Sequence, residues 1–371
     1  MKIKILFFAY VKRVGVTNPI GNMAIAAARF SDVSIIYDRK TELNNWFLDK
    51  FHENNIECID VLELKDFVNR QGEDSPVVFH CQGFSHLRKA ISIARPIDKI
   101  LMSVHCFRNA LWYARWVALI SYMFFYSRVD MWHFLCSKSR EEYFWFKDLP
   151  DNTCVFPLGI EELFMSDSGA KGIIKDVEGQ EILSENAATI IVYTARFQPW
   201  KRHDFLLHSL ESILKDNTYL VLIGEGPLRE KIMKLAVKLG LRKNVVFTGN
   251  IDRDDVHNIL SNANLSVSSS TSETFGCCIA EAFCMNVPVV TTDVGIAKSI
   301  IVDNQNGFVL DPGCTQAEFM EKTKEALRCF GGIDNNSGKE IFRWETFSRT
   351  VAENYESLSR NSKNKECAEL K

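Results

Sequence analysis

The alternation of apolar segments with helical periodicity constrains the fold of this chain more than any other feature of its sequence. Segments typical of buried strands occupy residues 3–10, 33–37, 59–62, 77–80, 100–105 and 132–136, and again 189–194, 219–224, 245–249, 265–269 and 287–291. Helical periodicity lies between them, as at 204–214, 228–239, 255–261 and 316–329. Strands that are apolar on both faces and alternate with helices are typical of parallel sheets covered on both sides. The sequence therefore predicts an α/β protein with two tandem Rossmann-like, doubly wound domains facing each other across a cleft.

Domain boundaries follow from the segments that lack either period. A chain of 371 residues is long enough for two domains of ordinary size. Residues 166–187 are polar and contain Gly and Ser, which predicts a linker between an N-terminal domain at 1–165 and a C-terminal domain at 188–343. The charged, polar tail 361–371 is predicted to be disordered.

Composition argues against several classes of protein. A formal net charge of −3, with 25% charged and 46% apolar residues, is typical of a globular protein and not of a dedicated nucleic-acid binder. The 11 cysteines form no CxxC pair, and no histidines have ligand spacing, so we expect reduced thiols in a cytosolic protein. The apolar run 5–11 is short and has no cleavage site after it, which favours a buried first strand over a signal peptide.

The segment 272–282 (SETFGCCIAEA) is the most informative about function. It places Glu273 in a loop, Gly276 at the start of a predicted helix and Glu281 inside that helix. The start of a helix offers unpaired N–H groups and a positive dipole end, which suit a diphosphate. The two carboxylates on either side of it could accept hydrogen bonds from sugar hydroxyls, an arrangement that a nucleotide sugar requires. Two solvated glutamates on a strand–turn–helix unit remain the alternative.

Other strand ends in the second half indicate the same ligand. Arg196 and Lys201 follow the strand 189–194, and both could reach a diphosphate. The segment 224–228 (GEGPL) follows a strand and opens a helix, but Arg229 occupies the place of the third glycine of a dinucleotide fingerprint. The segment 246–251 (VFTGNI) ends a strand where backbone groups could meet a nucleotide base.

In their order along the chain these motifs resemble retaining glycosyltransferase family 4, also called glycosyltransferases group 1, with the GT-B fold. The resemblance covers residues 188–357 and rests on 195–201, 224–228, 244–249, 273–282, 288–290 and 306–309. It implies a hexosyltransferase that uses a UDP- or GDP-linked sugar and a glycan or lipid-linked acceptor, with retention of anomeric configuration. By family analogy the pathway is bacterial surface polysaccharide or lipopolysaccharide biosynthesis. A nucleotide-sugar epimerase or phosphorylase of the same fold, or a catalytically silent nucleotide-sugar-binding scaffold, remains the alternative.

The resemblance also implies roles for individual residues. Arg196 and Lys201 would bind the donor diphosphate and stabilise the leaving nucleoside diphosphate, Glu281 would accept hydrogen bonds from the ribose, and Glu273 from the donor sugar. The catalytic set is Glu273, His105, Arg196 and Lys201, and the remaining donor-binding positions are Gly21, Asn250, Ile251, Phe275, Gly276 and Cys277. The pattern departs from the family at Asn286, Ile296 and Ser299, which puts the sugar specificity in doubt.

The first half matches the family less well. Gly21 lies in a glycine-containing stretch before the predicted helix 23–30 and would approach the donor phosphates, with a plain βα turn as the alternative. His105 ends a strand and would lie beside the transferred sugar, with a structural hydrogen bond as the alternative. His80 is expected only to line the cleft, and the helix 344–360 would cross back onto the first domain.

Two further segments bear on cofactors and partners. The DxD sequence Asp252-Arg253-Asp254 could bind a metal–diphosphate, but its place before a helix favours a helix cap, so no metal is predicted. The region Arg88–Arg128 is basic and aromatic, and its uncharged run 116–127 is too short to cross a bilayer. It is either core or a contact with an anionic membrane surface, the latter implying a cytoplasmic protein held peripherally on the inner face of the membrane.

Overall fold

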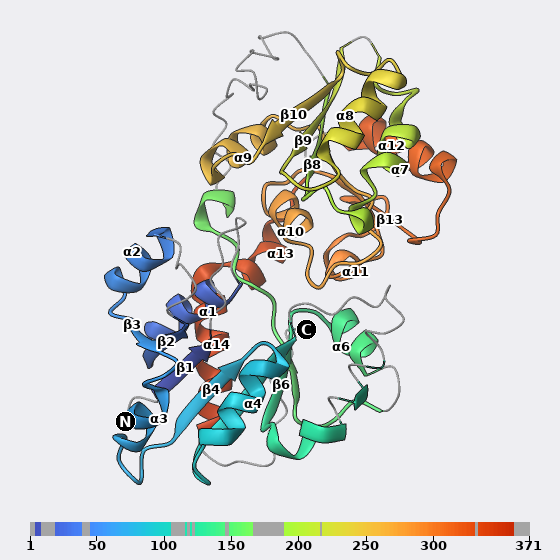
Figure 1. Ribbon diagram of the computed structural model, residues 1–371. Coiled ribbons are helices and arrows are strands. Elements are labelled where there is room, and N and C mark those ends of the chain that lie inside the picture. Colours follow the sequence, from blue (N-terminus) through green and yellow to red (C-terminus); the bar gives the residue numbers. More distant parts are fainter. Residues whose placement is uncertain are drawn as a thin grey trace. The chain divides into compact units, whose positions relative to one another are not determined.

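The computed structural model consists of two α/β units (Figure 1). It describes residues 4–8, 19–38, 45–104, 116, 119–120, 123–144, 148–165, 189–215, 217–330 and 333–359. Unit 1 comprises residues 1–159 and 341–371, and unit 2 comprises 160–340. The chain therefore passes from one unit to the other at 159/160 and again at 340/341. The predicted linker 166–187 and tail 361–371 lie outside the described residues.

Unit 1 contains a parallel sheet of seven strands in the order β3-β2-β1-β4-β5-β6-β7. The strands are β1 (Lys4–Phe8), β2 (Asp32–Tyr37), β3 (Glu57–Asp60), β4 (Val77–Cys81), β5 (Lys99–Val104), β6 (Met131–Phe134) and β7 (Thr153–Val155). The helices are α1 (Pro19–Ala28), α2 (Asn45–Glu53), α3 (Leu64–Asn69), α4 (Phe84–Ile93), α6 (Ser137–Tyr143) and α14 (Trp344–Ser359), with the 3-10 turn η1 (Tyr126–Arg128). The last of these helices, α14, packs on α1 and β4, so the end of the described chain belongs to the fold of its beginning.

Unit 2 contains a parallel sheet of six strands in the order β10-β9-β8-β11-β12-β13. The strands are β8 (Thr189–Thr194), β9 (Thr218–Ile223), β10 (Val245–Gly249), β11 (Leu265–Ser268), β12 (Val289–Thr292) and β13 (Gly307–Leu310). The helices are α7 (His203–Leu210), α8 (Arg229–Lys238), α9 (Arg253–Ser261), α10 (Cys277–Cys284), α11 (Ala297–Ile300), α12 (Gln316–Cys329) and α13 (Asn336–Lys339), and the 3-10 turns are η2 (Glu162–Met165), η3 (Pro199–Lys201) and η4 (Glu340–Phe342), the last reaching into unit 1. The predicted pair of parallel α/β domains is confirmed.

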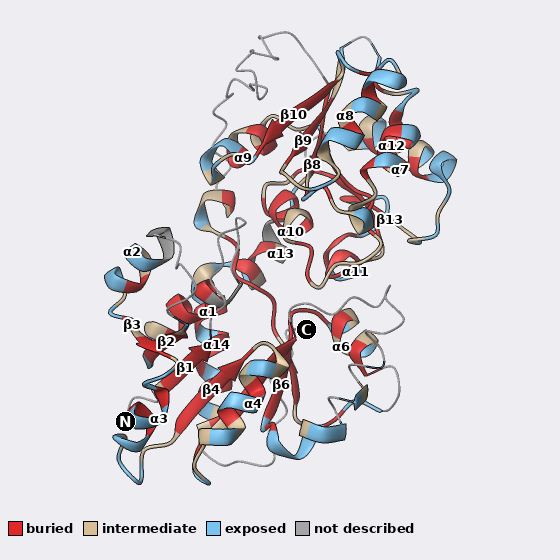
Figure 2. Cartoon of the chain, viewed as in Figure 1, coloured by how far each residue is buried: buried red, intermediate tan, exposed pale blue. Residues whose placement is uncertain are grey.

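The buried residues lie along the strands and the helix faces that cover them, shown red in Figure 2. The central strands β4 and β11 are buried at every position, as expected for parallel strands covered on both faces. In both sheets the strand order reverses beside the first strand: β1 has β2 on one side and β4 on the other, and β8 has β9 and β11. Ligands of open α/β sheets bind at the carboxyl ends of the strands beside such a reversal.

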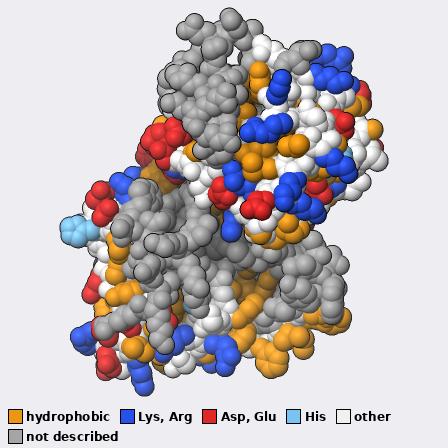
Figure 3. All heavy atoms as spheres, turned by 45° about the horizontal axis from the view of Figure 1, so that its top comes forward, with side chains coloured by type: hydrophobic (Ala, Val, Ile, Leu, Met, Phe, Trp, Pro, Cys, Tyr) orange, Lys and Arg blue, Asp and Glu red, His pale blue; other side chains and the backbone are white. Residues whose placement is uncertain are grey.

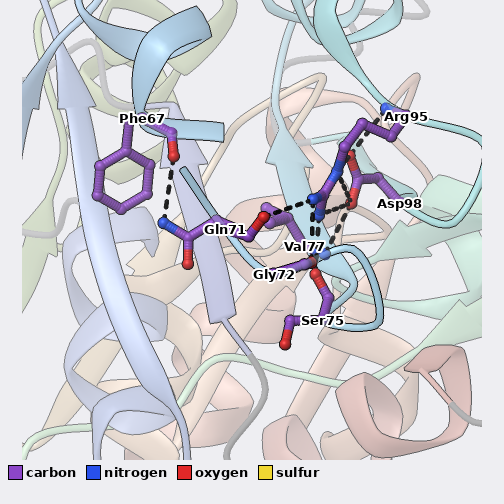
Figure 4. A network of polar contacts seen from close by, with 7 residues as sticks. All are labelled: Phe67, Gln71, Gly72, Ser75, Val77, Arg95 and Asp98. Atoms are coloured by element: carbon purple, nitrogen blue, oxygen red, sulfur yellow. Dashed lines mark hydrogen bonds and ion pairs between the residues drawn. The ribbon is translucent and has the colours of Figure 1, made fainter. Parts of the chain in front are cut away.

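A buried ion pair fixes the entry to β4 in unit 1 (Figure 4). Asp98 accepts hydrogen bonds from the guanidinium of Arg95 at 2.8 Å and from the backbone N–H of Val77 at 2.9 Å. The same guanidinium donates to the carbonyl oxygens of Gln71, Gly72 and Ser75. Each of these contacts joins two residues of the chain, so we interpret Arg95–Asp98 as a structural ion pair.

Candidate functional site

The reversal between β8 and β11 brings Lys201 and Glu273 together. Lys201 lies in η3, beyond the carboxyl end of β8, and Glu273 follows β11. The Lys201 ammonium donates a hydrogen bond to Glu273 Oε1, and the hydroxyl of Ser270 donates to the same oxygen at 2.7 Å. Both charged side chains are largely buried, 16% and 13% exposed. The sequence assigned these residues to one ligand, and the structure places them in direct contact.

Polar side chains hold the two loops that carry this pair. The hydroxyl of Ser269 donates to the carbonyl oxygen of Lys201 at 2.9 Å, and the hydroxyl of Tyr193 donates to the same carbonyl at 3.0 Å. The backbone N–H of Thr271 donates to the carbonyl of Trp200 at 2.8 Å. The serine-rich end of β11 therefore fixes the position of Lys201 through its backbone.

Electrostatics keep Lys201 cationic. Burial is the largest single influence and lowers the pKa of the Lys201 ammonium, but the charge and hydrogen bond of Glu273, together with Tyr193 and Cys278, outweigh it, so the net pKa lies above its ordinary value. Lys201 is therefore cationic at neutral pH. One of its ammonium N–H groups donates to Glu273, and the others remain as donors for an anion.

Arg196 lies between β8 and η3 and is exposed. Its guanidinium makes no ion pair or hydrogen bond with another residue of the described chain and is available to a ligand. The glycines of the 224–228 segment pack closely against the backbone of the loop that carries Arg196. A Cβ on Gly226 would lie 2.7 Å from the backbone nitrogen and oxygen of Phe197, and one on Gly224 would lie 2.5 Å from the carbonyl oxygen of Ala195. The glycines in this segment therefore have a packing role that the sequence did not reveal.

The segment 275–277 is held rigidly at the start of α10. Gly276 is the N-cap residue and adopts a left-handed conformation with φ +92°. The carbonyl of Phe275 accepts a hydrogen bond from the N–H of Ile296 at 2.8 Å, and a Cβ on Gly295 would lie only 2.2 Å from that carbonyl oxygen. The first N–H groups of a helix have no acceptor within the helix, so the rigid start of α10, with Cys277 as its first residue, suits an anion.

Glu281 lies inside α10 and is buried. Its Oε1 accepts a hydrogen bond from Arg253 Nη2 at 2.9 Å, and Arg253 Nε donates to Glu161 Oε1 at 3.1 Å. Burial raises the pKa of Glu281, and the charge of Arg253 offsets part of that rise. The sequence pattern did not identify Arg253 as a partner because 28 residues separate it from Glu281.

Asn250 and Ile251 follow the carboxyl end of β10, with Asn250 exposed and Ile251 half-buried. They directly precede α9, whose N-cap residue Asp252 accepts a hydrogen bond from the N–H of Asp255 at 2.9 Å. The cap predicted for the DxD sequence is confirmed. The described part of the chain holds no group of three or more His, Cys, Asp or Glu that could bind a metal ion.

The predicted residues of unit 1 have separate outcomes. His105 lies outside the described residues, and Gly21 lies in the first turn of α1, since this helix begins at Pro19 and not at residue 23. His80 is fully buried, so the expectation that it lines a cleft is wrong. It belongs to a buried relay: Tyr355 OH to His80 Nδ1 at 2.5 Å, His80 Nε2 to Ser103 at 2.6 Å, Ser103 to His133 Nδ1 at 2.7 Å, and His133 Nε2 to the carbonyl of Phe156 at 3.1 Å.

Comparisons with known proteins match this chain to glycosyltransferases. Residues 175–332 match the family model of glycosyl transferases group 1. Over 47% of this chain and 47% of the relative, it is 28% identical to N-acetyl-alpha-D-glucosaminyl L-malate synthase of Bacillus anthracis. Lipopolysaccharide glucosyltransferase WaaG of Escherichia coli is 34% identical over 33% of this chain and 32% of the relative. The chain thus spans about a third to a half of the length of the curated relatives it matches.

Similarity to solved structures extends over nearly the whole chain. The structure of Anabaena Alr3699/HepE in complex with UDP-glucose superimposes with a TM-score of 0.73 at 16% identity, covering 96% of this chain and 100% of that chain. The apo form of the lipopolysaccharide outer core galactosyltransferase WaaB gives a TM-score of 0.70 at 16% identity, covering 97% and 100%. At such identity the likeness shows the GT-B fold alone. The sequence matches support the group 1 glycosyltransferase family.

Proposed function

We propose that the protein is a retaining glycosyltransferase that moves a hexose-type sugar from a UDP- or GDP-linked donor to a glycan or lipid-linked acceptor. The observation that carries the proposal is the Lys201–Glu273 pair where the strand order reverses, which holds a cation and a carboxylate together. The name of the relative WaaG, a lipopolysaccharide glucosyltransferase, favours bacterial surface polysaccharide or lipopolysaccharide biosynthesis as the pathway.

The donor would use the described polar groups of unit 2 as follows. Arg196, Lys201 and the start of α10 (Phe275, Gly276 and Cys277) would hold the diphosphate. Glu281 would accept hydrogen bonds from the ribose, Glu273 from the sugar, and Asn250 with Ile251 would border the base. In unit 1, Gly21 would approach the phosphates and His105 the transferred sugar.

The chemistry is a substitution on one face of the sugar. The bond from the anomeric carbon to the diphosphate oxygen breaks, the acceptor oxygen bonds to the same face, and the leaving phosphate oxygen takes the acceptor proton. Negative charge develops on the nucleoside diphosphate, where Arg196, Lys201 and the helix dipole would stabilise it. These cations would neutralise the diphosphate without a metal, so we expect transfer to continue in EDTA.

A two-stage experiment tests the function. A thermal-shift screen against UDP, GDP and their sugars names the donor, because a ligand raises the melting temperature by mass action. The labelled donor is then incubated with and without saccharide acceptors. Acceptor-dependent release of nucleoside diphosphate supports the proposal. Conversion of the donor without acceptor favours an epimerase, phosphate-dependent cleavage favours a phosphorylase, and binding without turnover favours a silent scaffold.

We also propose that the acceptor is met at the inner face of the cytoplasmic membrane, where the Arg88–Arg128 region contacts anionic lipid. Trp116, Ile120, Met123 and Phe124 follow helical i, i+4, i+7, i+8 spacing and are all exposed, Phe124 by 74%. Figure 3 shows hydrophobic side chains gathered at the lower edge of the displayed face. No helix within the described residues is long and apolar enough to span a bilayer.

The same region carries basic side chains in addition to the apolar stripe. Arg95 and Lys99 are paired with Asp98 and Asp130, whereas Arg88, Lys89 and Arg128 are exposed and have no ion-pair partner among the described residues. Phe84 of α4 stacks on Phe125 with ring centroids 6.1 Å apart, which joins the helix that carries Arg88 and Lys89 to the stripe. Exposed apolar side chains beside unpaired cations fit an anionic lipid surface.

Vesicle flotation tests this contact. We expect binding to phosphatidylcholine vesicles containing about a quarter phosphatidylglycerol and little binding to pure phosphatidylcholine. Phe124→Asp should abolish binding, while Leu62→Asp, at an equally apolar exposed position outside the region, should leave it unchanged. A wild-type protein that stays in solution, or equal effects of the two substitutions, would rule out the contact.

A further inference from the structure

Arg253 joins three parts of unit 2 that lie far apart in the sequence. It is the first residue of α9, and its Nη2 reaches Glu281 Oε1 in α10 at 2.9 Å. Its Nε reaches Glu161 Oε1 at 3.1 Å, and its guanidinium carbon lies 4.3 Å from the ring centroid of Phe164 in η2. The guanidinium therefore has a carboxylate at two of its edges and an aromatic ring against its face, and this geometry leaves it little rotational freedom.

Glu281 depends on this guanidinium. Its side chain is 3% exposed, and an unpaired carboxylate at that depth is costly. Arg253 holds only Oε1, and Glu281 Oε2 accepts no hydrogen bond from a residue of the described chain. One oxygen is thus fixed by the protein, and the other has lone pairs left for a ligand.

We infer that Arg253 is a positioning residue for the nucleotide: it fixes Glu281 so that Oε2 is presented to the ribose hydroxyls. This inference rests on the proposed function, because it takes Glu281 as the ribose-binding residue. Through Glu161 and Phe164 the same guanidinium also holds the segment that directly follows the passage of the chain from unit 1 to unit 2 at 159/160. Glu281 and this segment are therefore held by one side chain.

The alternatives make different demands on the ligand. If Arg253 bound the diphosphate directly, its loss would lower the affinity for inorganic pyrophosphate as much as the affinity for a nucleoside diphosphate. If Arg253 only stabilised the fold, its loss would resemble the loss of Arg95. Arg95 is a matched control because its side chain is 20% exposed beside a fully buried Asp98, against 19% for Arg253 beside Glu281.

Calorimetric titration with UDP, GDP and inorganic pyrophosphate tests the inference. We expect Arg253→Met to lower the affinity for whichever of UDP and GDP binds better by about tenfold or more, and to leave the affinity for pyrophosphate unchanged. Arg253→Lys keeps the positive charge but cannot contact Glu281 and Glu161 from two edges of one planar group, so it should lower the affinity for the nucleoside diphosphate by less. It replaces Arg253→Met in the titration if the Met variant does not fold. Arg95→Met should lower stability without changing either affinity.

A double-mutant cycle separates action through Glu281 from a direct contact. The double variant Arg253→Met/Glu281→Gln should bind the nucleoside diphosphate no more weakly than Glu281→Gln alone. Full affinity in both Arg253 variants, equal loss of pyrophosphate, or additive effects in the cycle would overturn the inference. If Glu281→Gln itself binds normally, or the wild type binds neither UDP nor GDP, the assignment of the nucleotide site in the proposed function fails and the inference fails with it.

Discussion

The two units have similar parallel sheets but differ in where their polar side chains lie along the strands. In unit 2 the charged pair Lys201–Glu273 lies beyond the strand ends, in the loops after β8 and β11. In the described part of unit 1, His80, Ser103 and His133 lie within β4, β5 and β6, fully buried, and the relay continues to Tyr355 of α14.

The donor and acceptor roles in the unit 1 relay can be assigned from its last acceptor, the carbonyl of Phe156. The carbonyl of Phe156 can only accept, so Nε2 of His133 donates to it, and a neutral His133 then accepts from Ser103 through Nδ1. Ser103 in turn accepts from His80 Nε2, and His80 Nδ1 accepts from Tyr355. All four of these hydrogen bonds can form in this direction with both imidazoles neutral. A neutral relay inside strands fixes a helix to a sheet, whereas charged groups beyond strand ends remain available to a ligand.

Removing the cation at the strand ends should have the largest effect. We expect Lys201→Ala to lower turnover about a hundredfold or more, because the leaving diphosphate loses a fixed positive charge. The measurement is steady-state release of nucleoside diphosphate in the presence of acceptor. Lys322→Ala, which removes another lysine of unit 2 that is paired with a glutamate, should leave turnover unchanged. Normal turnover in the Lys201 variant would make the charged pair structural, like the relay.

The next effect is a pH dependence inside unit 2. Burial, with the nearby charge of Lys201, lowers the pKa of His203 to about 3, and the ring stacks on Phe197 at 4.2 Å between centroids. The unfolded chain takes up this proton below pH about 6.5 and the folded chain does not, so stability falls as the pH falls from about 6.5 towards 3.

Substitution of His203 isolates that contribution. At pH 5 the loss from this group is about 2 kcal/mol, and His203→Phe should remove it, with a much smaller change at pH 7. Hydrogen exchange of the buried amides of β8 reports the free energy of opening of unit 2 alone. Identical pH profiles for wild type and variant would show that His203 does not stay neutral in the fold.

Much of the fold and part of the site could be predicted from the sequence. The parallel sheets follow from strands apolar on both faces, and the Lys201–Glu273 contact follows from motifs at two strand ends that the topology makes adjacent. Arg253 could not be predicted as the partner of Glu281, because the pair depends on how α9 and α10 pack and not on any spacing in the chain. The spacing did predict the helix cap at Asp252, because a cap is local.

His80 shows why a strand-end histidine misleads. The sequence places it near the carboxyl end of an apolar strand, where both a ligand contact and a structural hydrogen bond are consistent with the pattern. The outcome depends on Tyr355, which lies 275 residues away and packs on β4 through α14. A contact of such sequence separation leaves no periodic signal.

A smaller effect tests the neutral relay. Tyr355→Phe removes the hydroxyl that donates to the buried Nδ1 of His80, which should cost about 1 to 2 kcal/mol of stability. Hydrogen exchange of the amides of β4 measures it, and affinity for nucleoside diphosphates should not change. A loss of nucleotide affinity in this variant would contradict the separation between structural polar groups within strands and ligand-binding groups beyond them.

The smallest effect concerns the DxD sequence. Asp252→Ala removes the acceptor of the Asp255 N–H and should lower stability by about 1 kcal/mol, while Asp252→Asn, another good N-cap residue, should largely restore it. Neither change should alter turnover, because the carboxylate serves the start of α9 and not the diphosphate. Urea titration and the transfer assay, each with and without EDTA, measure both quantities. A fall in turnover that Asn does not rescue and that added divalent cations reverse would instead make Asp252 a metal ligand, and the strand ends of unit 2 would then depend on a cation beyond Arg196 and Lys201.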